Sequence, residues 1–357
     1  MISSFGISVY LSSGFEKNKE IIDRAKSNGF NIVFTSFHIS EEGSHNNLEN
    51  IKELIDYCNK SDVFLCADVS IKTLDMLNLE SINDLYNIGL SCVRFDYGID
   101  IMTMASVSKE HTIMINASNI NEEILIQYKE VGMNLTNVIA AHNYYPKPHT
   151  GLRLDYVRDI NLLCNKYGIK TLAFIPGLKE PRGPIFEYLP TVEKHRYSPT
   201  LVSLMELRFE AKTDYILIGD VDYESGIYNS IKRVIDNIVV LETNFFDPSV
   251  KDSLSNQLLS NRKDLSSDTI RIVGTREKNL LEKLINRELN VERYKVGDII
   301  ISNERYLRYK NEVEIVLKEF EQSEKLNLIG RINDQYVDCL KYISNDRSFI
   351  LVDLSNS

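Results

Sequence analysis

One pattern repeats along residues 1–236 and limits the folds that this chain can adopt. A short apolar run is followed by a polar break and then by a segment whose apolar residues have helical spacing. In residues 17–27 and 48–59, for example, the apolar residues fall on one face of a helix. Several helical segments end at a glycine, a common residue at helix C-termini. The apolar runs are residues 5–11, 32–37, 63–69, 92–97, 112–116, 137–142, 171–175 and 215–219.

Eight strand–helix units in about 235 residues predict a (β/α)8 barrel, the TIM-barrel fold of the α/β class. The alternative is a doubly wound open sheet, in which a glycine-rich GxGxxG turn usually follows the first strand. No such turn follows the first apolar run of this sequence. We therefore expect a closed barrel with an outer ring of helices.

The sequence changes in character after about Asn237. Helical spacing gives way to short strand-like segments joined by polar turns, and only residues 279–287 have a clear helical pattern. A chain of 357 residues is also long for a single core, so two domains are expected. We predict a catalytic barrel in residues 1–237 and a smaller, mostly β barrel domain in residues 238–357. Its strand-like segments are residues 270–274, 298–302, 312–320, 326–329 and 349–354.

The charge of the chain excludes some classes of partner. It has 41 basic and 51 acidic residues, a net charge of −10, and no run of five or more lysines and arginines. We therefore expect neither a nucleic acid nor a membrane as partner. An anionic ligand would have to be held by a few well-placed groups. The sequence leaves the oligomeric state open.

The spacing of cysteines and histidines argues against a metal site. The five cysteines are scattered, form no CxxC pair and lie mostly in apolar runs, so we expect reduced cysteines in the core. The histidines lack the HxH and HExxH spacings of zinc sites. No cofactor is implied. No basic segment opens the N-terminus and no apolar run approaches the length of a membrane span, so a cytoplasmic location is expected.

In a barrel of this kind the C-terminal ends of the strands form one rim, where active sites lie. Every predicted strand but the first ends in polar side chains. Arg94 and Asp96 are two residues apart on one strand and point to the same side, and Asp68 ends the neighbouring strand. Two carboxylates on adjacent strand ends suit glycoside hydrolysis, in which one protonates the leaving oxygen and the other attacks or activates water.

We therefore predict Asp96 and Asp68 as the catalytic acid and its partner, with Glu187 as the reserve. Two alternatives remain open for these residues. Arg94 and Asp96 could form a structural ion pair, and carboxylates at strand ends also bind metals or hydroxyl groups.

Residues 172–196, with the sequence LAFIPGLKEPRGPIFEYLPTVEKHR, contain a long loop after the seventh predicted strand. An apolar run ends at Pro176, and three further prolines stiffen the connection that follows. Long, charge-rich loops after strands are usually binding or catalytic surface, although a merely solvated connection is the alternative. Arg182, Gly183 and Thr150 offer a guanidinium, close backbone amides and a hydroxyl, the donors that suit a phosphate.

Aromatic residues near the rim favour a sugar ligand. Flat apolar faces in the loops can stack on sugar rings, and the alternative is that they only cover the barrel end. These aromatic residues are Tyr144, Tyr145, Phe186 and Tyr188. The predicted substrate-binding residues are Arg94, Asn116, His142, Asn143, Tyr145, Thr150, Arg182, Gly183, Glu193, His195, Arg196 and Asp220.

Several motifs of the first domain resemble those of one known family, in the same order along the chain. They are FGISVYL, FTSFHISEE, ADVS, VRFDYG, INAS, HNYYPKPHTGL, FIPG…RGPIFEYLPTVEKHR and LIGD. In these motifs the chain is similar to the exo-acting 6-phospho-N-acetylmuramidases of the MupG type, and the resemblance covers the whole first domain. Two positions depart from the family pattern: Ser40 stands where proline is expected, and Tyr188 stands where glycine is usual.

The resemblance implies a TIM barrel followed by a cyclophilin-like C-terminal β domain, in a bacterial cytoplasmic enzyme of peptidoglycan recycling. It implies a glycosidase that cleaves the β-1,4 bond of 6-phospho-N-acetylmuramyl-N-acetylglucosamine to give N-acetylmuramic acid 6-phosphate and N-acetylglucosamine. Two other functions stay open: a phosphosugar isomerase or aldolase on the same barrel, and a non-catalytic sugar-phosphate sensor. The Schiff-base form of an aldolase would need a lysine at a strand end, and the sequence shows none there.

Overall fold

The computed structural model describes residues 3–37, 48–95, 99–284 and 291–353. The chain divides into two compact units, Met1–Ser225 and Gly226–Ser357. Each unit has its own sheet, and the two are described separately below.

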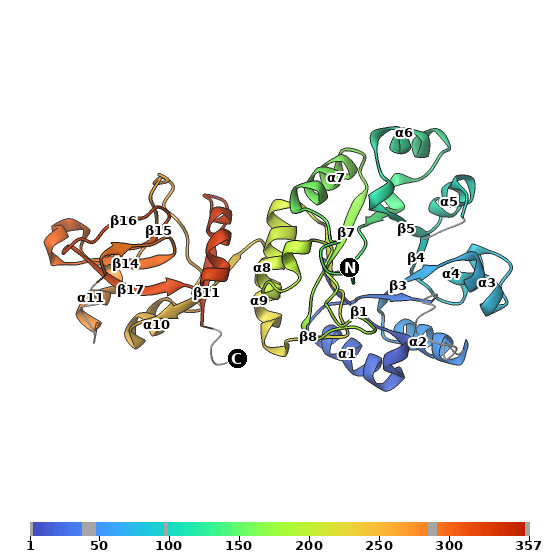
Figure 1. The fold of residues 1–357 in the computed structure, drawn as a ribbon, viewed down its shortest axis with the longest axis horizontal. Coiled ribbons are helices and arrows are strands. Elements are labelled where there is room, and N and C mark those ends of the chain that lie inside the picture. Colours follow the sequence, from blue (N-terminus) through green and yellow to red (C-terminus); the bar gives the residue numbers. More distant parts are fainter. Residues whose placement is uncertain (1–2, 38–47, 96–98, 285–290, 354–357) are drawn as a thin grey trace. The chain divides into compact units, whose positions relative to one another are not determined.

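Within the described part of the first unit, eight parallel strands form a closed barrel (Figure 1). Neighbouring strands pair in chain order, and the barrel closes where Phe5 of the first strand lies opposite Ile216 of the last. The predicted TIM barrel is thus confirmed, and each predicted strand lies at or near its predicted position. The strands are β1 (Phe5–Ser8), β2 (Ile32–Ser36), β3 (Phe64–Val69), β4 (Cys92–Phe95), β5 (Thr112–Asn116), β6 (Val138–Ala141), β7 (Lys170–Ile175) and β9 (Tyr215–Ile218).

Figure 1 shows the helices of the first unit on the outside of these strands. The predicted amphipathic segments form helices that bury their apolar side, as Ile21, Ile22 and Ala25 do in α1. Short helices after β3 and β4 were not predicted. They begin at good N-caps, such as Ser81 and Asp100. The helices are α1 (Phe15–Ser27), α2 (Leu48–Lys60), α3 (Ile71–Leu77), α4 (Ile82–Asn87), α5 (Ile101–Ser108), α6 (Glu122–Glu130), α7 (Leu154–Lys166) and α8 (Thr200–Met205).

The inside of the barrel is a packed apolar core. It includes Cys66, Cys92 and Met114 from three neighbouring strands, and the rings of Phe34 and Phe174 pack edge to face with centroids 5.2 Å apart. Side chains alternate along a strand, so the residues two positions further on face the same way at the C-terminal end. The apolar core therefore leads to a polar layer at the rim, formed in part by Asp68, Arg94 and Asn116.

Two short strands extend the loop that follows β7. β8 (Leu178–Glu180) pairs antiparallel with β10 (Asp222–Tyr223). Ion pairs of 2.5 Å between Lys17 and Glu180 and 2.6 Å between Lys179 and Asp222 hold this small sheet, and Arg24 of α1 also pairs with Asp222. The first part of the long loop is thus fixed to the barrel and to α1.

The second unit contains a six-stranded curled sheet, within the residues that the structure describes, in the order β12-β15-β14-β17-β11-β18. This confirms the predicted mostly β domain, although the sequence analysis did not predict β11 and α10. The sheet strands are β11 (Val239–Phe245), β12 (Thr269–Arg271), β14 (Asp298–Ser302), β15 (Val313–Val316), β17 (Leu326–Ile332) and β18 (Phe349–Val352). Outside the sheet lie β13 (Arg293–Tyr294), β16 (Phe320–Glu321), α9 (Tyr228–Ile235), α10 (Pro248–Leu254) and α11 (Leu280–Lys283).

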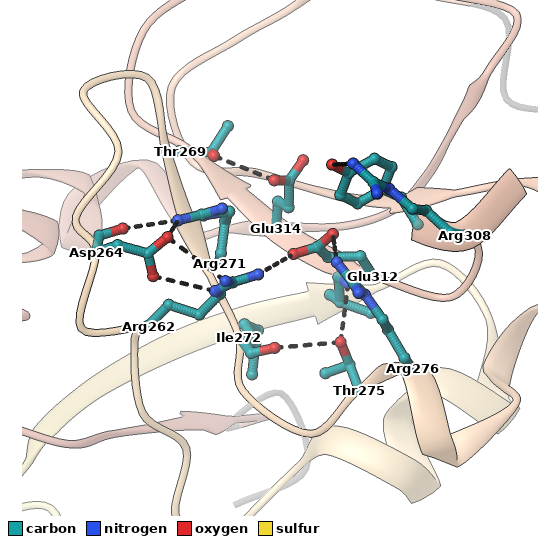
Figure 2. A network of polar contacts seen from close by, with 12 residues as sticks. Arg262, Asp264, Thr269, Arg271, Ile272, Thr275, Arg276, Arg308, Glu312 and Glu314 are labelled. Atoms are coloured by element: carbon teal, nitrogen blue, oxygen red, sulfur yellow. Dashed lines mark hydrogen bonds and ion pairs between the residues drawn. The ribbon is translucent and has the colours of Figure 1, made fainter. Parts of the chain in front are cut away.

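An irregular segment links the two edge strands of this sheet. Leu259 pairs with Phe349 of β18, and Asn261 pairs with Ile272 just after β12. Figure 2 shows the polar network that joins the neighbouring residues to Glu312, just before β15. Its ion pairs are Arg276–Glu312 at 2.6 Å, Arg262–Glu312 at 3.5 Å, Arg262–Asp264 at 3.2 Å and Arg271–Asp264 at 2.6 Å. The network ties the linking segment to the sheet.

All five cysteines are buried and free, as expected for reduced core residues. Among the residues that the structure describes, no helix is both long enough and apolar enough to cross a membrane.

Candidate active site

Asp68 and Arg94 form a buried ion pair at the rim of the barrel. They lie opposite each other on β3 and β4, and they are 8% and 5% exposed. Arg94 Nη1 donates to Asp68 Oδ1 at 2.9 Å and to Oδ2 at 3.0 Å, and Arg94 Nη2 donates to Oδ1 of Asn143. Both oxygens of Asp68 act as acceptors, as in an ionised carboxylate.

Asp96, the predicted catalytic acid, lies outside the described residues. The alternative interpretation paired it with Arg94 in a structural ion pair, whereas the ion-pair partner of Arg94 within the described chain is Asp68. Of the expected pair of carboxylates on adjacent strand ends, the structure therefore describes only Asp68. Asp68 is in place, and the role of Asp96 stays a prediction.

A second arginine lies at the same rim, in the loop after β8. The guanidinium carbon of Arg182 is 4.4 Å from the centroid of the Tyr10 ring, and its Nη1 donates to the Tyr144 hydroxyl at 3.3 Å. The Tyr10 hydroxyl donates to the carbonyl of Gly219. Burial raises the pKa of Tyr10 and of Tyr144, so both phenols are neutral at physiological pH.

Tyr144 joins the two arginines into one arrangement. Besides its contact with Arg182, it lies close enough to Asp68 and Arg94 for their charges to act on its pKa. Its ring packs edge to face on Phe174 of the barrel core, with centroids 5.2 Å apart. We call the resulting set of residues the rim cluster. It comprises Tyr10, Asp68, Arg94, Asn143, Tyr144 and Arg182.

Asp220 directly follows β9 and its neighbour Gly219, and it is only 1% exposed. Its Oδ2 accepts the backbone N–H of Gly177 at 2.9 Å. Burial raises the pKa of Asp220 to about 6, against the opposing effect of backbone N–H groups at Gly177, Arg182 and Leu189. Asp220 therefore fixes the loop that carries Arg182.

Arg196 and Glu193 tie the later part of this loop to the loop that follows β6. The guanidinium of Arg196 is buried and donates to both oxygens of Glu193, at 2.8 and 2.7 Å. Glu193 also accepts the backbone N–H groups of His149 and Gly151, and the hydrogen bonds from Arg196 lead in lowering its pKa to about 2. Arg196 also donates hydrogen bonds to the backbone carbonyls of four residues, Tyr145, Lys147, Glu187 and Tyr188.

The two buried histidines among the predicted residues face away from the rim cluster. His142 Nε2 lies 2.8 Å from Asn161 of α7, and burial lowers the pKa of His142 to about 4. His195 Nε2 lies 2.9 Å from Glu206, in the π-helical turn after α8, and burial lowers its pKa as well. Both rings are therefore neutral near pH 7 and connect the barrel to its helices.

The remaining predicted residues lie nearby in local contacts. Asn116 caps the turn that follows β5, and Tyr145 donates its backbone N–H to Pro190. The Thr150 hydroxyl donates to the Lys147 carbonyl at 2.6 Å, and Glu187 accepts from the Tyr197 hydroxyl at 2.5 Å. Within the described chain, the hydrogen bonds of these four residues are thus made to residues outside the rim cluster.

The structure thus brings together four predicted residues: Asp68, Arg94, Asn143 and Arg182. The sequence analysis missed Tyr10, because the first predicted strand was the one without a polar end. The signal was the tyrosine near the end of the motif FGISVYL. Its side chain supplies the ring beneath Arg182.

A closed barrel of parallel strands, with a carboxylate and two arginines gathered at its C-terminal rim, is the architecture of a TIM-barrel enzyme. Two family models match this sequence. The description "6-phospho-N-acetylmuramidase, N-terminal" applies to residues 5–233, and "6-phospho-N-acetylmuramidase, C-terminal" applies to residues 238–352. The chain belongs to the 6-phospho-N-acetylmuramidase family, and it is a glycosidase by that membership. The predicted family and enzyme class are confirmed.

Two solved structures are similar to this one over both units. A conserved protein of unknown function from Enterococcus faecalis is 28% identical with a TM-score of 0.82, and the match covers 99% of this chain and 97% of that one. An uncharacterized protein from B. cereus is 25% identical with a TM-score of 0.81, and the match covers 99% and 100%. No curated protein matches the sequence.

Proposed function

We propose that this glycosidase hydrolyses the β-1,4 bond of 6-phospho-N-acetylmuramyl-N-acetylglucosamine in peptidoglycan recycling. The bond between C1 of the muramyl sugar and O4 of N-acetylglucosamine breaks. The leaving O4 takes a proton and C1 takes the hydroxyl of a water molecule, which gives N-acetylmuramic acid 6-phosphate and N-acetylglucosamine. The observation that carries this proposal is the rim cluster, which combines a carboxylate with two arginines in a chain of this family.

Asp68 suits the partner that stays ionised. Its two oxygens accept from Arg94, so it acts as the nucleophile or the general base, or it stabilises positive charge on the sugar. The acid is assigned to Asp96 from its place in the sequence. Glu187 stays the reserve, because its carboxylate is held by Tyr197. We assign Asp220 to the loop rather than to the chemistry, because it accepts a backbone N–H.

Arg182 is the proposed phosphate contact. In TIM barrels phosphates frequently bind at the loops that follow the seventh and eighth strands, and Arg182 lies between β7 and β9. An acidic chain needs local positive charge to hold a doubly charged ligand. The guanidinium lies on the Tyr10 ring and next to the Tyr144 hydroxyl, so its position is fixed before a ligand arrives.

Arg182→Lys tests the phosphate contact. Lysine cannot reproduce the bidentate guanidinium fork, so kcat/KM for the phosphorylated disaccharide should fall roughly ten- to hundredfold, about 1.5–3 kcal/mol. The unphosphorylated disaccharide is the matched control, and its already low kcat/KM should change little. Equal kcat/KM for the two substrates in the wild-type protein would show that the phosphate is not recognised.

The reaction itself is tested by incubating the purified full chain with the phosphorylated disaccharide and measuring free N-acetylglucosamine. We expect stoichiometric release of N-acetylglucosamine and N-acetylmuramic acid 6-phosphate. Binding of the disaccharide without release would favour a sugar-phosphate sensor. A change in the phosphosugar without cleavage of the glycosidic bond would favour an isomerase or aldolase.

A further inference from the structure

Phe186 presents a large aromatic side chain to water near the rim cluster. It is 63% exposed, four residues beyond Arg182, which is only 8% exposed. Its backbone has a φ of +59°, in the left-handed region that favours glycine. Leu178 and Tyr188 in the same loop also have positive φ, at 62° and 56°. An exposed apolar ring in such a backbone is costly, and such costs concentrate at functional sites.

The loop holds Phe186 firmly. The Phe186 N–H donates to the carbonyl of Arg182 at 3.2 Å, which closes a tight turn. On the other side of Phe186, the buried Arg196 donates to the carbonyls of Glu187 at 2.7 Å and Tyr188 at 3.0 Å. The backbone on both sides of the ring is therefore fixed by hydrogen bonds.

The ring itself lies against Gly183. A Cβ atom added at Gly183 would be 2.9 Å from Cζ of Phe186, so only glycine leaves room for the ring in this position. Gly183 directly follows Arg182, the proposed phosphate contact. The tip of the ring thus lies against the backbone next to Arg182, a member of the rim cluster, and most of the residue stays open to solvent.

We propose that Phe186 forms a subsite for the leaving sugar, by stacking on the apolar face of the N-acetylglucosamine ring. This inference rests on the proposed function. Arg182 is the more deeply buried of the two, so the phosphorylated sugar occupies the inner position. Phe186 is exposed, so it contacts the sugar on the solvent side. That sugar is the leaving N-acetylglucosamine. Hexose rings have an apolar face of C–H groups, and a flat aromatic ring matches it in shape.

Phe186→Ala tests the subsite with two substrates that differ in the leaving group. One is the phosphorylated disaccharide, and the other is 6-phospho-N-acetylmuramyl β-fluoride, in which fluoride replaces the leaving sugar. We expect kcat/KM for the disaccharide to fall about three- to tenfold, mainly through KM, because one stacking contact is lost. The kcat/KM for fluoride release should stay within about twofold of wild type, since fluoride offers nothing to stack.

Two further variants serve as controls. Phe186→Tyr keeps the ring and should keep kcat/KM for the disaccharide within about twofold. Ile185→Ala removes the exposed neighbour in the same loop and should leave both substrates unaffected. Equal losses on both substrates in Phe186→Ala, or no loss on either, would overturn the subsite. Failure of the wild-type protein to release fluoride and N-acetylglucosamine would instead overturn the proposed function.

Discussion

At the scale of single residues, the rim cluster depends on groups that cannot be removed one at a time without consequence. Asp68 and Arg94 are both nearly buried, and each neutralises the other. Breaking a buried pair leaves an uncompensated charge, which costs about 3–5 kcal/mol. Asparagine at position 68 keeps one acceptor, so its cost is expected to be lower than that of alanine.

Asp68→Asn should lower kcat for the phosphorylated disaccharide by at least about a thousandfold, since an amide supplies neither a nucleophile nor a base. The measurement is kcat at a temperature at which thermal melting shows the variant to be folded. Asp159→Asn, at an exposed aspartate of α7, is the matched control, with kcat expected within a few-fold of wild type. A rate within about tenfold of wild type, about 1.4 kcal/mol of barrier, would remove Asp68 from catalysis. The same assay on Asp96→Asn tests the proposed acid.

Asp220 gives the stability of the barrel a pH dependence of its own. Its folded-state pKa of about 6 lies above the ordinary 3.8, so the folded protein holds this proton more tightly than the unfolded one. The resulting stabilisation is fully present below the ordinary pKa and is lost as the pH rises through 6. Between these limits it changes by about 3 kcal/mol. The free energy of unfolding in urea, measured at pH 4 and pH 7 for wild type and Asp220→Asn, should differ in pH dependence by about 2–2.5 kcal/mol, because the unfolded-state carboxyl is already largely ionised at pH 4. Parallel pH dependences would show that Asp220 ionises normally.

At the scale of elements, the barrel strands were predictable and the contacts between loops were not. Barrel strands are buried on both faces, so β3 and β7 contain the apolar runs FLCA and LAFI. Helices α3 and α4 have only seven and six residues, too few to show a helical period. β11 follows α9 after a short connection, and three polar residues follow its apolar first half, so the strand shows no regular alternation in the sequence.

The same holds for the rim residues: positions on strands were predictable, and contacts between loops were not. Asp68 and Arg94 end predicted strands, so their proximity follows from the barrel alone. Two of the carbonyls that accept from Arg196 lie in another loop, at Lys147 and Tyr145, 49 and 51 residues away. No local pattern encodes such contacts, because they arise only when both loops fold over the same end of the barrel. Arg196 was therefore predicted to contact substrate, whereas its contacts in the structure suit a loop anchor.

Arg196→Ala tests that anchoring role. The change leaves several partly buried carbonyls and Glu193 without their donor, at a cost of about 3 kcal/mol. For a protein of this size the melting temperature should fall by roughly 6–12 °C. Tyr197→Phe, which removes one exposed hydrogen bond to Glu187, is the matched control and should shift stability by less than about 0.5 kcal/mol. A melting temperature within about 2 °C of wild type for Arg196→Ala would show that the loops are held in another way.

At the scale of the whole molecule, the extent of the second unit can be read in two ways. The sequence analysis placed the boundary between residues 237 and 238, and the two family models end and begin at residues 233 and 238. The division into compact units instead places α9, residues 228–235, with the second unit. Within this unit, α9 lies beside β11, and Arg233 Nη1 donates to Asn256 Oδ1 at 3.2 Å.

We therefore expect α9 to stabilise the second unit when that unit is expressed alone. Ile231 and Val234 of α9 are fully buried, and burying each side chain is worth about 1.5–3 kcal/mol. A chain of residues 226–357 should thus be more stable than a chain of residues 238–357 by about 2–5 kcal/mol, with a single cooperative transition in urea. As a control, Ile231→Ala should lower the stability of the longer chain by about 2–4 kcal/mol. Equal stability of the two chains would assign α9 to the barrel and place the boundary at residue 237.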